Sequence, residues 1–267
     1  MRKTISIRDQ QVLEALAEAI EEHKDLADWL RFYEALFRAQ FEAKGEMQSE
    51  IEVRDERARK WRLEGGIPQL TFDQLKLEGE SFARLVERIE EVLLLYNPDW
   101  EAQRRPPDTS KILEKAREEF EKDGSLDPSL GLEALAVNFA LSPYLQRAAE
   151  IIMPLLDQDA WRRPYCPVCG GQPCFAELKG EGGIRYLLCT RCYAEWIYRR
   201  LGCPFCGAEQ MPYFPSEDGL YRLYVCDACK RYLKTIDLRQ ARRQVYLPVE
   251  RLLTVSMDMA AQGEGYK

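Results

Sequence analysis

Nine cysteines lie in one stretch of this 267-residue chain, between Cys166 and Cys229. Eight of them form four Cys-x-x-Cys pairs, and nineteen residues separate the two pairs in each half of the stretch. Sliding the sequence by 37 residues lays one half on the other, so the unit is duplicated. Two such pairs at this separation are typical of a tetrahedral site with four thiolates. The spacing therefore predicts two local metal sites, one formed by Cys166, Cys169, Cys189 and Cys192 and the other by Cys203, Cys206, Cys226 and Cys229.

The chemistry of these sites is restricted by their ligands. Four thiolates around one ion suit iron and zinc alike, so a rubredoxin-like iron site and a zinc ribbon both stay open. Disulfides need an oxidising compartment, and we expect none because no signal peptide precedes the chain. Thioredoxin-type redox pairs need a βαβ context, which this stretch punctuated by Pro and Gly lacks. A closed four-thiolate site has no open coordination position, so its metal should stabilise folding rather than activate water.

Two further side chains that could do chemistry stand alone. Cys174 has no counterpart in the repeat, where Met211 takes its place, and we expect a small buried hydrophobic residue with a reactive thiol as the alternative. His23 is the only histidine, and its place near the end of an expected helix favours a role at that C-terminus. A single histidine argues against an active site built on a histidine-bound metal or on a Ser-His pair.

The elements that must position these residues follow two patterns. Up to about residue 160, apolar residues recur at helical spacing, which is typical of a bundle of six to eight helices with short loops. Among these we expect a helix at about 7–23 capped by Ser6, one capped by Asp25, a charge-rich loop at 46–70, and two helices that meet at Ser142-Pro143. Residues 184–188 and 221–225, between the cysteine pairs, have the composition of strands. Each module should therefore be a small antiparallel sheet that is stabilised by its bound metal ion.

The predicted fold class is therefore α+β, mainly α. We expect a helical domain at 1–160, a first four-cysteine ribbon module at 161–201, a second at 202–238 and a C-terminal helical segment at 239–267. A formal charge of −7 and a pI near 5.1 argue against a broad affinity for nucleic-acid phosphates. No apolar run approaches the roughly 18 residues that would span a bilayer. We expect a cytoplasmic protein without membrane insertion, and the oligomeric state stays open.

The residues around the cysteines carry a resemblance. They are Tyr165–Pro173 (YCPVCGGQP), Gly183–Trp196 (GIRYLLCTRCYAEW), Cys203–Gly207 (CPFCG) and Cys226–Lys234 (CDACKRYLK). This series resembles the formate dehydrogenase accessory protein family FdhE over about the last 100 residues, and Leu252–Tyr266 is similar to the family's closing helix. That helix usually opens with two adjacent aspartates in the family, whereas this chain has Val249-Glu250, a departure at a possible partner contact.

The resemblance implies a helical domain followed by two rubredoxin-like modules, in a protein that is not an enzyme. It implies an assembly chaperone that binds the catalytic subunit of a molybdenum- or tungsten-pterin formate dehydrogenase in the cytoplasm, late in maturation and before any export. A rubredoxin-like electron carrier is the second hypothesis. A nucleic-acid adaptor, which the net negative charge of the chain disfavours, is the third. Residues beside the cysteine pairs could form the partner surface, although Tyr186 and Trp196 favour packing; they are Arg185, Tyr186, Glu195 and Trp196.

Overall fold

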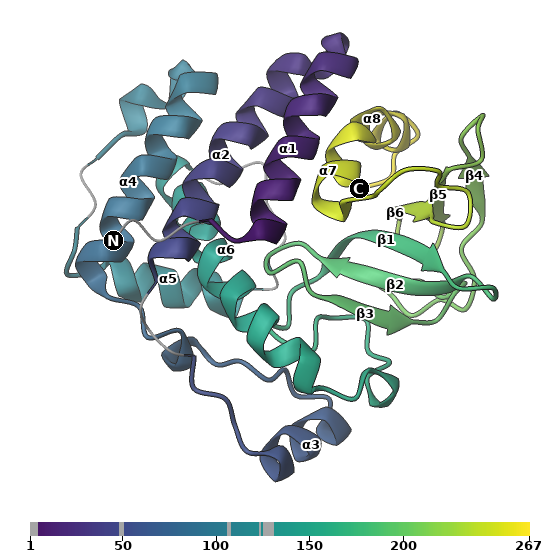
Figure 1. Ribbon diagram of the computed structural model, residues 1–267, viewed down its shortest axis with the longest axis horizontal. Coiled ribbons are helices and arrows are strands. Elements are labelled where there is room, and N and C mark those ends of the chain that lie inside the picture. Colours follow the sequence, from purple (N-terminus) through teal and green to yellow (C-terminus); the bar gives the residue numbers. More distant parts are fainter. Residues whose placement is uncertain (1–4, 48–50, 106–107, 123, 125–130) are drawn as a thin grey trace. The chain divides into compact units, whose positions relative to one another are not determined.

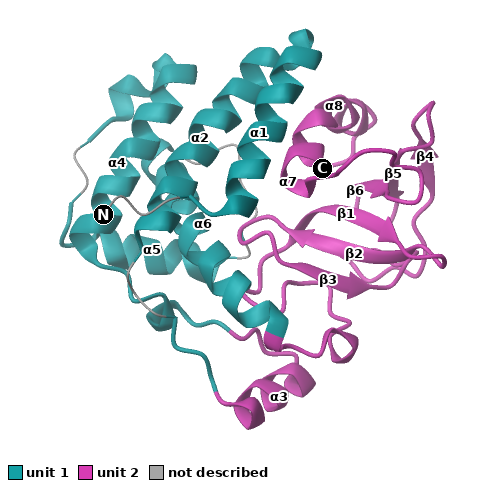
Figure 2. Ribbon diagram, in the orientation of Figure 1, with its two compact units in different colours: residues 1–54, 70–154 teal, residues 55–69, 155–267 magenta. Residues whose placement is uncertain are grey.

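The computed structural model describes residues 5–47, 51–105, 108–122, 124 and 131–267 (Figure 1). The chain divides into two compact units (Figure 2). The helical unit comprises residues 1–54 and 70–154, and the ribbon unit comprises residues 55–69 and 155–267. The segment 55–69 thus groups with the cysteine-rich part, although it lies inside the helical half of the sequence.

Five α-helices form the described part of the helical unit: α1 (Ile7–Glu22), α2 (Ala27–Glu46), α4 (Gly79–Tyr96), α5 (Ile112–Glu121) and α6 (Leu132–Ile152). Their inward faces carry fully buried side chains such as Leu16, Leu30, Val86, Ile89 and Leu141. Burial of each such side chain contributes about 1.5–3 kcal/mol, so these apolar stripes hold the bundle together. No helix in the described ranges is both long and apolar enough to cross a membrane.

The start of α1 agrees with the sequence and the start of α2 does not. Ser6 caps α1, because its hydroxyl accepts a hydrogen bond from the backbone N–H of Asp9 at 3.2 Å. His23 is the C-terminal cap of the same helix, as predicted. Asp25, however, lies within a short 3-10 turn (Lys24–Leu26), and α2 begins at Ala27 with no side-chain cap. The prediction of Asp25 as a cap was therefore wrong, because the turn continues almost directly into the helix.

Pro143 does not start a new helix but lies inside α6. A proline in a helix has no N–H, so the carbonyl four residues earlier loses its partner. That carbonyl belongs to Phe139, and the side-chain amide of Gln40 on α2 donates to it at 2.9 Å. Gln40 is buried, so a neighbouring helix replaces the bond that the proline removes. The predicted break at Ser142-Pro143 was wrong because the sequence alone does not show this contact.

A buried cation also joins three helices of the bundle. Lys44 on α2 lies 2.7 Å from a carboxylate oxygen of Asp9 on α1 and 2.6 Å from one of Glu150 on α6.

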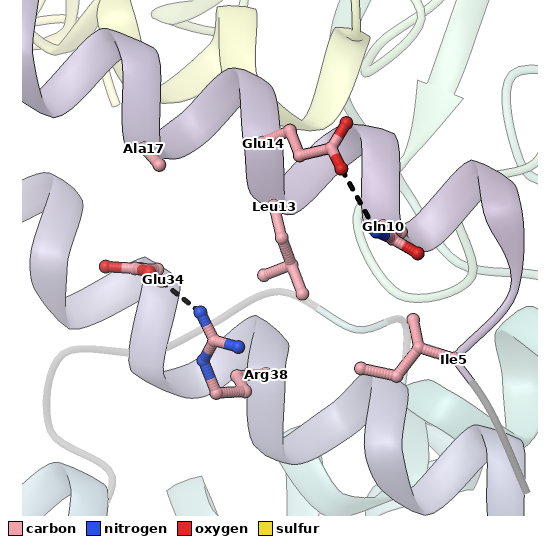
Figure 3. Close-up of a pocket in the computed structure, with 7 residues that line it drawn as sticks. All are labelled: Ile5, Gln10, Leu13, Glu14, Ala17, Glu34 and Arg38. Carbon is pink, nitrogen blue, oxygen red and sulfur yellow. Dashed lines mark hydrogen bonds and ion pairs between the residues drawn. The ribbon is translucent and has the colours of Figure 1, made fainter.

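Between α1 and α2 lies a pocket of about 410 Å³ (Figure 3). The charged and amide side chains on its rim are paired with each other, Gln10 with Glu14 at 3.1 Å and Arg38 with Glu34 at 2.9 Å.

The segment 55–69, expected to be a loop, contains α3 (Glu56–Gly65). Asp55 caps its start by accepting from the N–H of Ala58 at 2.8 Å. Gly66 ends it at a φ of +68°, a backbone conformation that favours glycine. Only one residue of α3, Leu63, is buried, so its apolar pattern was too weak to predict a helix.

A single six-stranded sheet organises the ribbon unit, in the order β3-β2-β1-β6-β5-β4 (Figure 1). The strands are β1 (Pro173–Lys179), β2 (Ile184–Cys189), β3 (Glu195–Tyr198), β4 (Tyr213–Pro215), β5 (Tyr221–Cys226) and β6 (Arg231–Asp237). Each module forms antiparallel pairs, as predicted, and β1 then pairs with β6 in parallel, with Ala176 opposite Thr235. The two modules therefore share one sheet instead of forming two separate ones.

Two short helices, α7 (Leu247–Leu253) and α8 (Val255–Gly263), pack on the sheet. Leu247 joins the core of Phe175, Leu188 and Ile236, and Ala261 joins Leu223 and Val225. The expected single closing helix is interrupted at Thr254. Lys234 on β6 stabilises the interruption, because its ammonium donates to the carbonyls of Arg251 at 2.7 Å and Thr254 at 3.2 Å.

Candidate metal centres

The eight paired cysteines come together in the two groups that the spacing predicts. In each group the four sulfur atoms lie within 4.8 Å of one another. The separation is 3.5 Å between Cys166 and Cys192, and 3.6 Å between Cys206 and Cys226. A tetrahedron with metal–sulfur bonds of about 2.3 Å has edges of about 3.8 Å, so the spacing fits one ion at the middle of each group. The role of these residues as ligands stays a prediction.

The environment of the first group also fits a cation. All four of its cysteines are buried. Burial raises the pKa of the Cys166 and Cys192 thiols above the usual range, while hydrogen bonds from Cys166 and its neighbours hold the pKa of Cys169 below it. Four thiols in such a dry site cannot all ionise without a positive charge among them. A thiophilic ion such as zinc or iron would supply that charge.

The first turn of each module has the same backbone geometry. The N–H of Val168 points at the sulfur of Cys166, and that of Phe205 points at the sulfur of Cys203, both at 3.4 Å. Gly170 and Gly207, which follow the second cysteine of each turn, have φ values of +76° and +80°, a conformation that favours glycine. These turns direct two sulfurs and their N–H partners to one point.

The second turn of each module reaches the same geometry without glycine. Tyr193 follows Cys192 with a φ of +55°, and Lys230 follows Cys229 with a φ of +56°. This conformation is uncommon for residues with a side chain and persists only where the surroundings impose it. The sequence carries no signal for it, because neither residue type favours a left-handed backbone.

The two groups differ in their exposure to solvent. In the second group Cys203 and Cys226 are buried, Cys229 is half-buried and Cys206 is exposed. Solvent thus reaches one side of this group, whereas the first group is enclosed. An ion in the second group would be easier for a chelator or a redox partner to approach.

The first turn of the first module is supported by the segment 66–69. The N–H of Gln69 donates to the carbonyl of Pro167 at 2.8 Å, and the Tyr165 hydroxyl donates to the carbonyl of Gly66 at 2.7 Å. Sequence reasoning missed this support, because Gln69 lies about one hundred residues before the cysteines that it helps to position. The sequence predicted this segment only as part of the charge-rich loop at 46–70.

Cys174 stands apart from both groups. Its side chain is half-buried on β1, and its sulfur lies 3.7 Å from the carbonyl oxygen of Leu188. Burial raises the pKa of its thiol, which disfavours the reactive thiolate. The expectation of a small hydrophobic side chain fits this environment better than the alternative of a reactive thiol.

Two of the four residues considered for the partner surface are buried instead. Arg185 and Trp196 have no exposed side-chain surface, and the indole N–H of Trp196 donates to the carbonyl of Arg163 at 2.9 Å. The packing reading of Trp196 is confirmed and the surface reading of Arg185 was wrong. Tyr186 and Glu195 are partly exposed, so they can still meet a partner.

The departure at Val249-Glu250 is also explained by burial. Glu250 is 1% exposed, and both its carboxylate oxygens accept hydrogen bonds. Oε2 accepts from the Tyr221 hydroxyl at 2.5 Å and from Arg243 at 2.9 Å, and Oε1 accepts from Arg243 at 2.5 Å. Val249 is buried as well. This pair therefore fastens α7 to the sheet and offers nothing to a partner.

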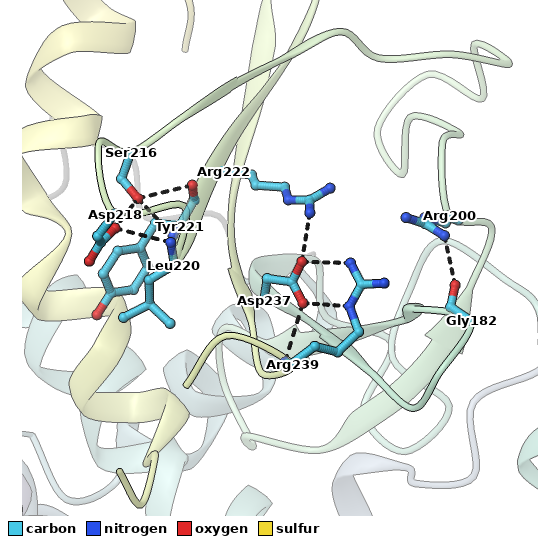
Figure 4. A network of polar contacts seen from close by, with 9 residues as sticks. All are labelled: Gly182, Arg200, Ser216, Asp218, Leu220, Tyr221, Arg222, Asp237 and Arg239. Atoms are coloured by element: carbon cyan, nitrogen blue, oxygen red, sulfur yellow. Dashed lines mark hydrogen bonds and ion pairs between the residues drawn. The ribbon is translucent and has the colours of Figure 1, made fainter. Parts of the chain in front are cut away.

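A second buried carboxylate, Asp237, organises the far end of β6 (Figure 4). Arg239 donates to it through Nε at 2.7 Å and Nη2 at 2.6 Å, and Arg222 donates at 2.6 Å. The hydrogen bonds from Arg239 hold the pKa of Asp237 below its usual range. Nearby, exposed Arg200 donates to the carbonyl of Gly182 at 2.6 Å. The network ties β5, β6 and the following turn together.

Comparisons with known proteins agree with the resemblance read from the sequence. Residues 165–200 match the family model described as "FdhE, central domain". A "Protein FdhE homolog" of Pseudomonas aeruginosa is 28% identical over 95% of this chain and 85% of its own length. One from Aquifex aeolicus is 32% identical over 47% of this chain and 46% of its own length, so that match spans less than half of the relative.

A solved structure extends the similarity to the fold. The crystal structure of the FdhE protein from Pseudomonas aeruginosa matches 100% of this chain and 93% of its own, with a TM-score of 0.65 and 25% identity. The resemblance to the FdhE family is therefore confirmed, and it covers the helical half as well as the ribbons. The fold class predicted from the sequence is confirmed by the same match and by the two cysteine groups.

Proposed function

We propose, from the confirmed resemblance to the FdhE family, that this protein is an accessory protein and not an enzyme. It binds the catalytic subunit of a molybdenum- or tungsten-pterin formate dehydrogenase in the cytoplasm and assists a late step of its maturation. The observation that carries the proposal is the structural match to an FdhE protein over the whole chain, with both cysteine groups formed.

In this proposal each cysteine group holds one iron or zinc ion and thereby fixes the shape of the ribbon unit. The ligands are Cys166, Cys169, Cys189 and Cys192 at the first centre and Cys203, Cys206, Cys226 and Cys229 at the second. Four protein ligands complete a tetrahedron and leave no position for a substrate. The partner contacts come from partly exposed residues beside the centres, such as Tyr186 and Glu195.

One observation favours a second candidate function, that of an electron carrier. Cys206 is exposed, so an iron ion in the second centre would lie close to solvent and to a redox partner. Metal analysis with a visible spectrum separates the two functions. A carrier must hold iron that cycles reversibly by one electron, whereas a chaperone acts equally well with zinc.

Deletion of the gene tests the proposed function directly. The deletion strain should contain the formate dehydrogenase polypeptide in an inactive form, and the unaltered gene should restore activity. Cys189→Ser should fail to restore it, because loss of one ligand from a closed thiolate site disrupts the surrounding surface. The purified protein should also bind the purified catalytic subunit in a direct assay.

Cys174→Ser is the matched control, since this cysteine belongs to neither group and a serine can keep its contact with the carbonyl of Leu188. It should restore dehydrogenase activity fully. Normal formate dehydrogenase activity in the deletion strain, or formate oxidation by this protein alone, would refute the chaperone function.

A further inference from the structure

Arg185 on β2 is a cation that is buried within the ribbon unit. Its side chain has no exposed surface, and within the described residues it forms no ion pair. Two of its nitrogens, Nε and Nη2, also have no hydrogen-bond partner there. Removing a guanidinium from water costs several kcal/mol unless a negative charge lies nearby. A nearby anionic group is therefore needed to offset this cost.

Besides a hydrogen bond to the carbonyl of Arg199 at 3.4 Å, Arg185 has two contacts that lead toward the second cysteine group. Nη1 donates to the carbonyl of Gly202 at 3.1 Å, directly before Cys203. The guanidinium carbon lies 4.3 Å from the ring centroid of Tyr224 on β5, the strand that ends at Cys226. A side chain of the first module thus lies between the two segments that carry the sulfurs of the second.

Electrostatics point to the same group. Burial lowers the pKa of Arg185, while its interactions with Tyr224, then with Tyr198 and Cys203, act in the opposite direction and favour the cation. A divalent ion with four thiolates carries a net charge of −2, and the burial of Arg185 strengthens the attraction between that charge and the guanidinium. The first group has a buried arginine of its own, Arg191, which lies between Cys189 and Cys192 in the sequence.

We propose that Arg185 is the counter-charge of the second metal centre, so that the first module supplies part of the binding energy for the metal of the second. Two neighbours on the first module strengthen this link. The Tyr198 hydroxyl donates to the carbonyl of Cys203 at 3.2 Å, and Arg199 donates to that of Gly207 at 3.2 Å. The inference rests on the proposed metal sites and adds an order of dependence between them.

The test measures zinc affinity at each centre of the full chain by competition with a chromogenic chelator. The unaltered protein should bind two zinc ions. In Arg185→Gln the affinity of the second centre should fall by about 10–100-fold, the usual effect of losing a group that supports metal ligands. The first centre should keep its affinity, which also shows that the variant is folded. Cys206→Ser identifies the signal of the second centre.

Two further variants make the test specific for charge. Arg185→Lys keeps the cation and should retain most of the affinity, and Arg200→Gln, an exposed arginine of the same module, should change nothing. Equal zinc affinities in Arg185→Gln and the unaltered chain, equal weakening of both centres, or an Arg185→Lys as weak as Arg185→Gln would each overturn the inference. An unaltered chain that binds fewer than two zinc ions would instead refute the proposed metal sites.

Discussion

Cys203 is the residue at which the grouping of the ligands can be tested. It is buried beside Cys206, Cys226 and Cys229, and the sulfur of Cys229 lies 3.8 Å away. Cys203→Ser should lower the metal content from two ions to about one, because a closed thiolate site seldom tolerates the loss of a ligand. Elemental analysis of the purified variant measures the change, and the near-ultraviolet spectrum reports whether the first module stays ordered.

Cys174→Ser again serves as the control and should bind two ions. Equal loss of metal from both centres in Cys203→Ser would contradict the local grouping. We inferred that the second centre depends on a residue of the first module. Cys166→Ser, which disrupts the first module, should therefore weaken both centres.

Glu90 on α4 gives the helical unit a pH dependence. It is 2% exposed, and burial, followed by the charge of Glu133, raises its pKa from 4.5 to about 7. Between these values the folded chain holds a proton that the unfolded chain has lost. The contribution of Glu90 to the free energy of unfolding should therefore be full below pH 4.5, fall as the pH rises toward 7, and stay level above it. The slope is at most about 1.4 kcal/mol per pH unit.

Glu90→Gln keeps the shape of the side chain and does not titrate. Its free energy of unfolding in urea should exceed that of the unaltered chain at pH 8, and the difference should shrink at pH 5. Glu80→Gln, an exposed residue near the start of the same helix, should leave the pH profile as it is. An unchanged profile in Glu90→Gln would show that burial does not perturb this carboxyl group.

At the scale of elements, Gln40 and Pro143 should act as a pair. Gln40→Met leaves the carbonyl of Phe139 without a donor and should cost about 1–3 kcal/mol of stability. Pro143→Ala restores an N–H that can bond this carbonyl within α6, so Gln40→Met should cost less in that background. A double-mutant cycle measured by urea unfolding gives the coupling. Additive effects of the two substitutions would contradict the proposed replacement of the helical bond.

What the sequence predicted at this scale depended on local signals. The strands at 184–188 and 221–225 and the glycines after the first turns follow from residue type and spacing, and the structure has them. The parallel pairing of β1 with β6 does not, because no local pattern distinguishes a strand at the edge of a module from one at a junction. The left-handed Tyr193 and Lys230 are likewise imposed by their surroundings.

For the whole molecule, the sequence predicted two kinds of structure but not how the chain is distributed between them. Residues 55–69 lie in the predicted charge-rich loop at 46–70, within the helical half of the sequence. In the structure they belong to the ribbon unit through contacts such as that of Gln69 with Pro167. Membership of a unit is decided by contacts distant in sequence, which neither composition nor periodicity reports.

The segments on either side of this excursion are held together within the helical unit. Gln74 donates to the carbonyl of Glu52 at 2.6 Å and accepts a hydrogen bond from Arg54. Residues 54 and 70 therefore lie close enough for a short linker to join them. We propose that the helical unit is an independent domain, as expected for 1–160, with this segment belonging to the other unit.

The prediction is that residues 1–154, with 55–69 replaced by a short Gly-Ser linker, unfold cooperatively and keep their helices without metal. The apolar core of the helical unit contains none of the cysteines, so a chelator should lower the stability of the full chain only in the ribbon unit. Circular dichroism with thermal unfolding measures both effects. A matched truncation at 160 that keeps residues 55–69 should fold too, but with this segment open to protease, because it loses contacts with the ribbon unit such as that of Gln69 with Pro167. A linker variant that is soluble only with the ribbons attached would show that the two units share one core, and the division of the chain proposed here would then be wrong.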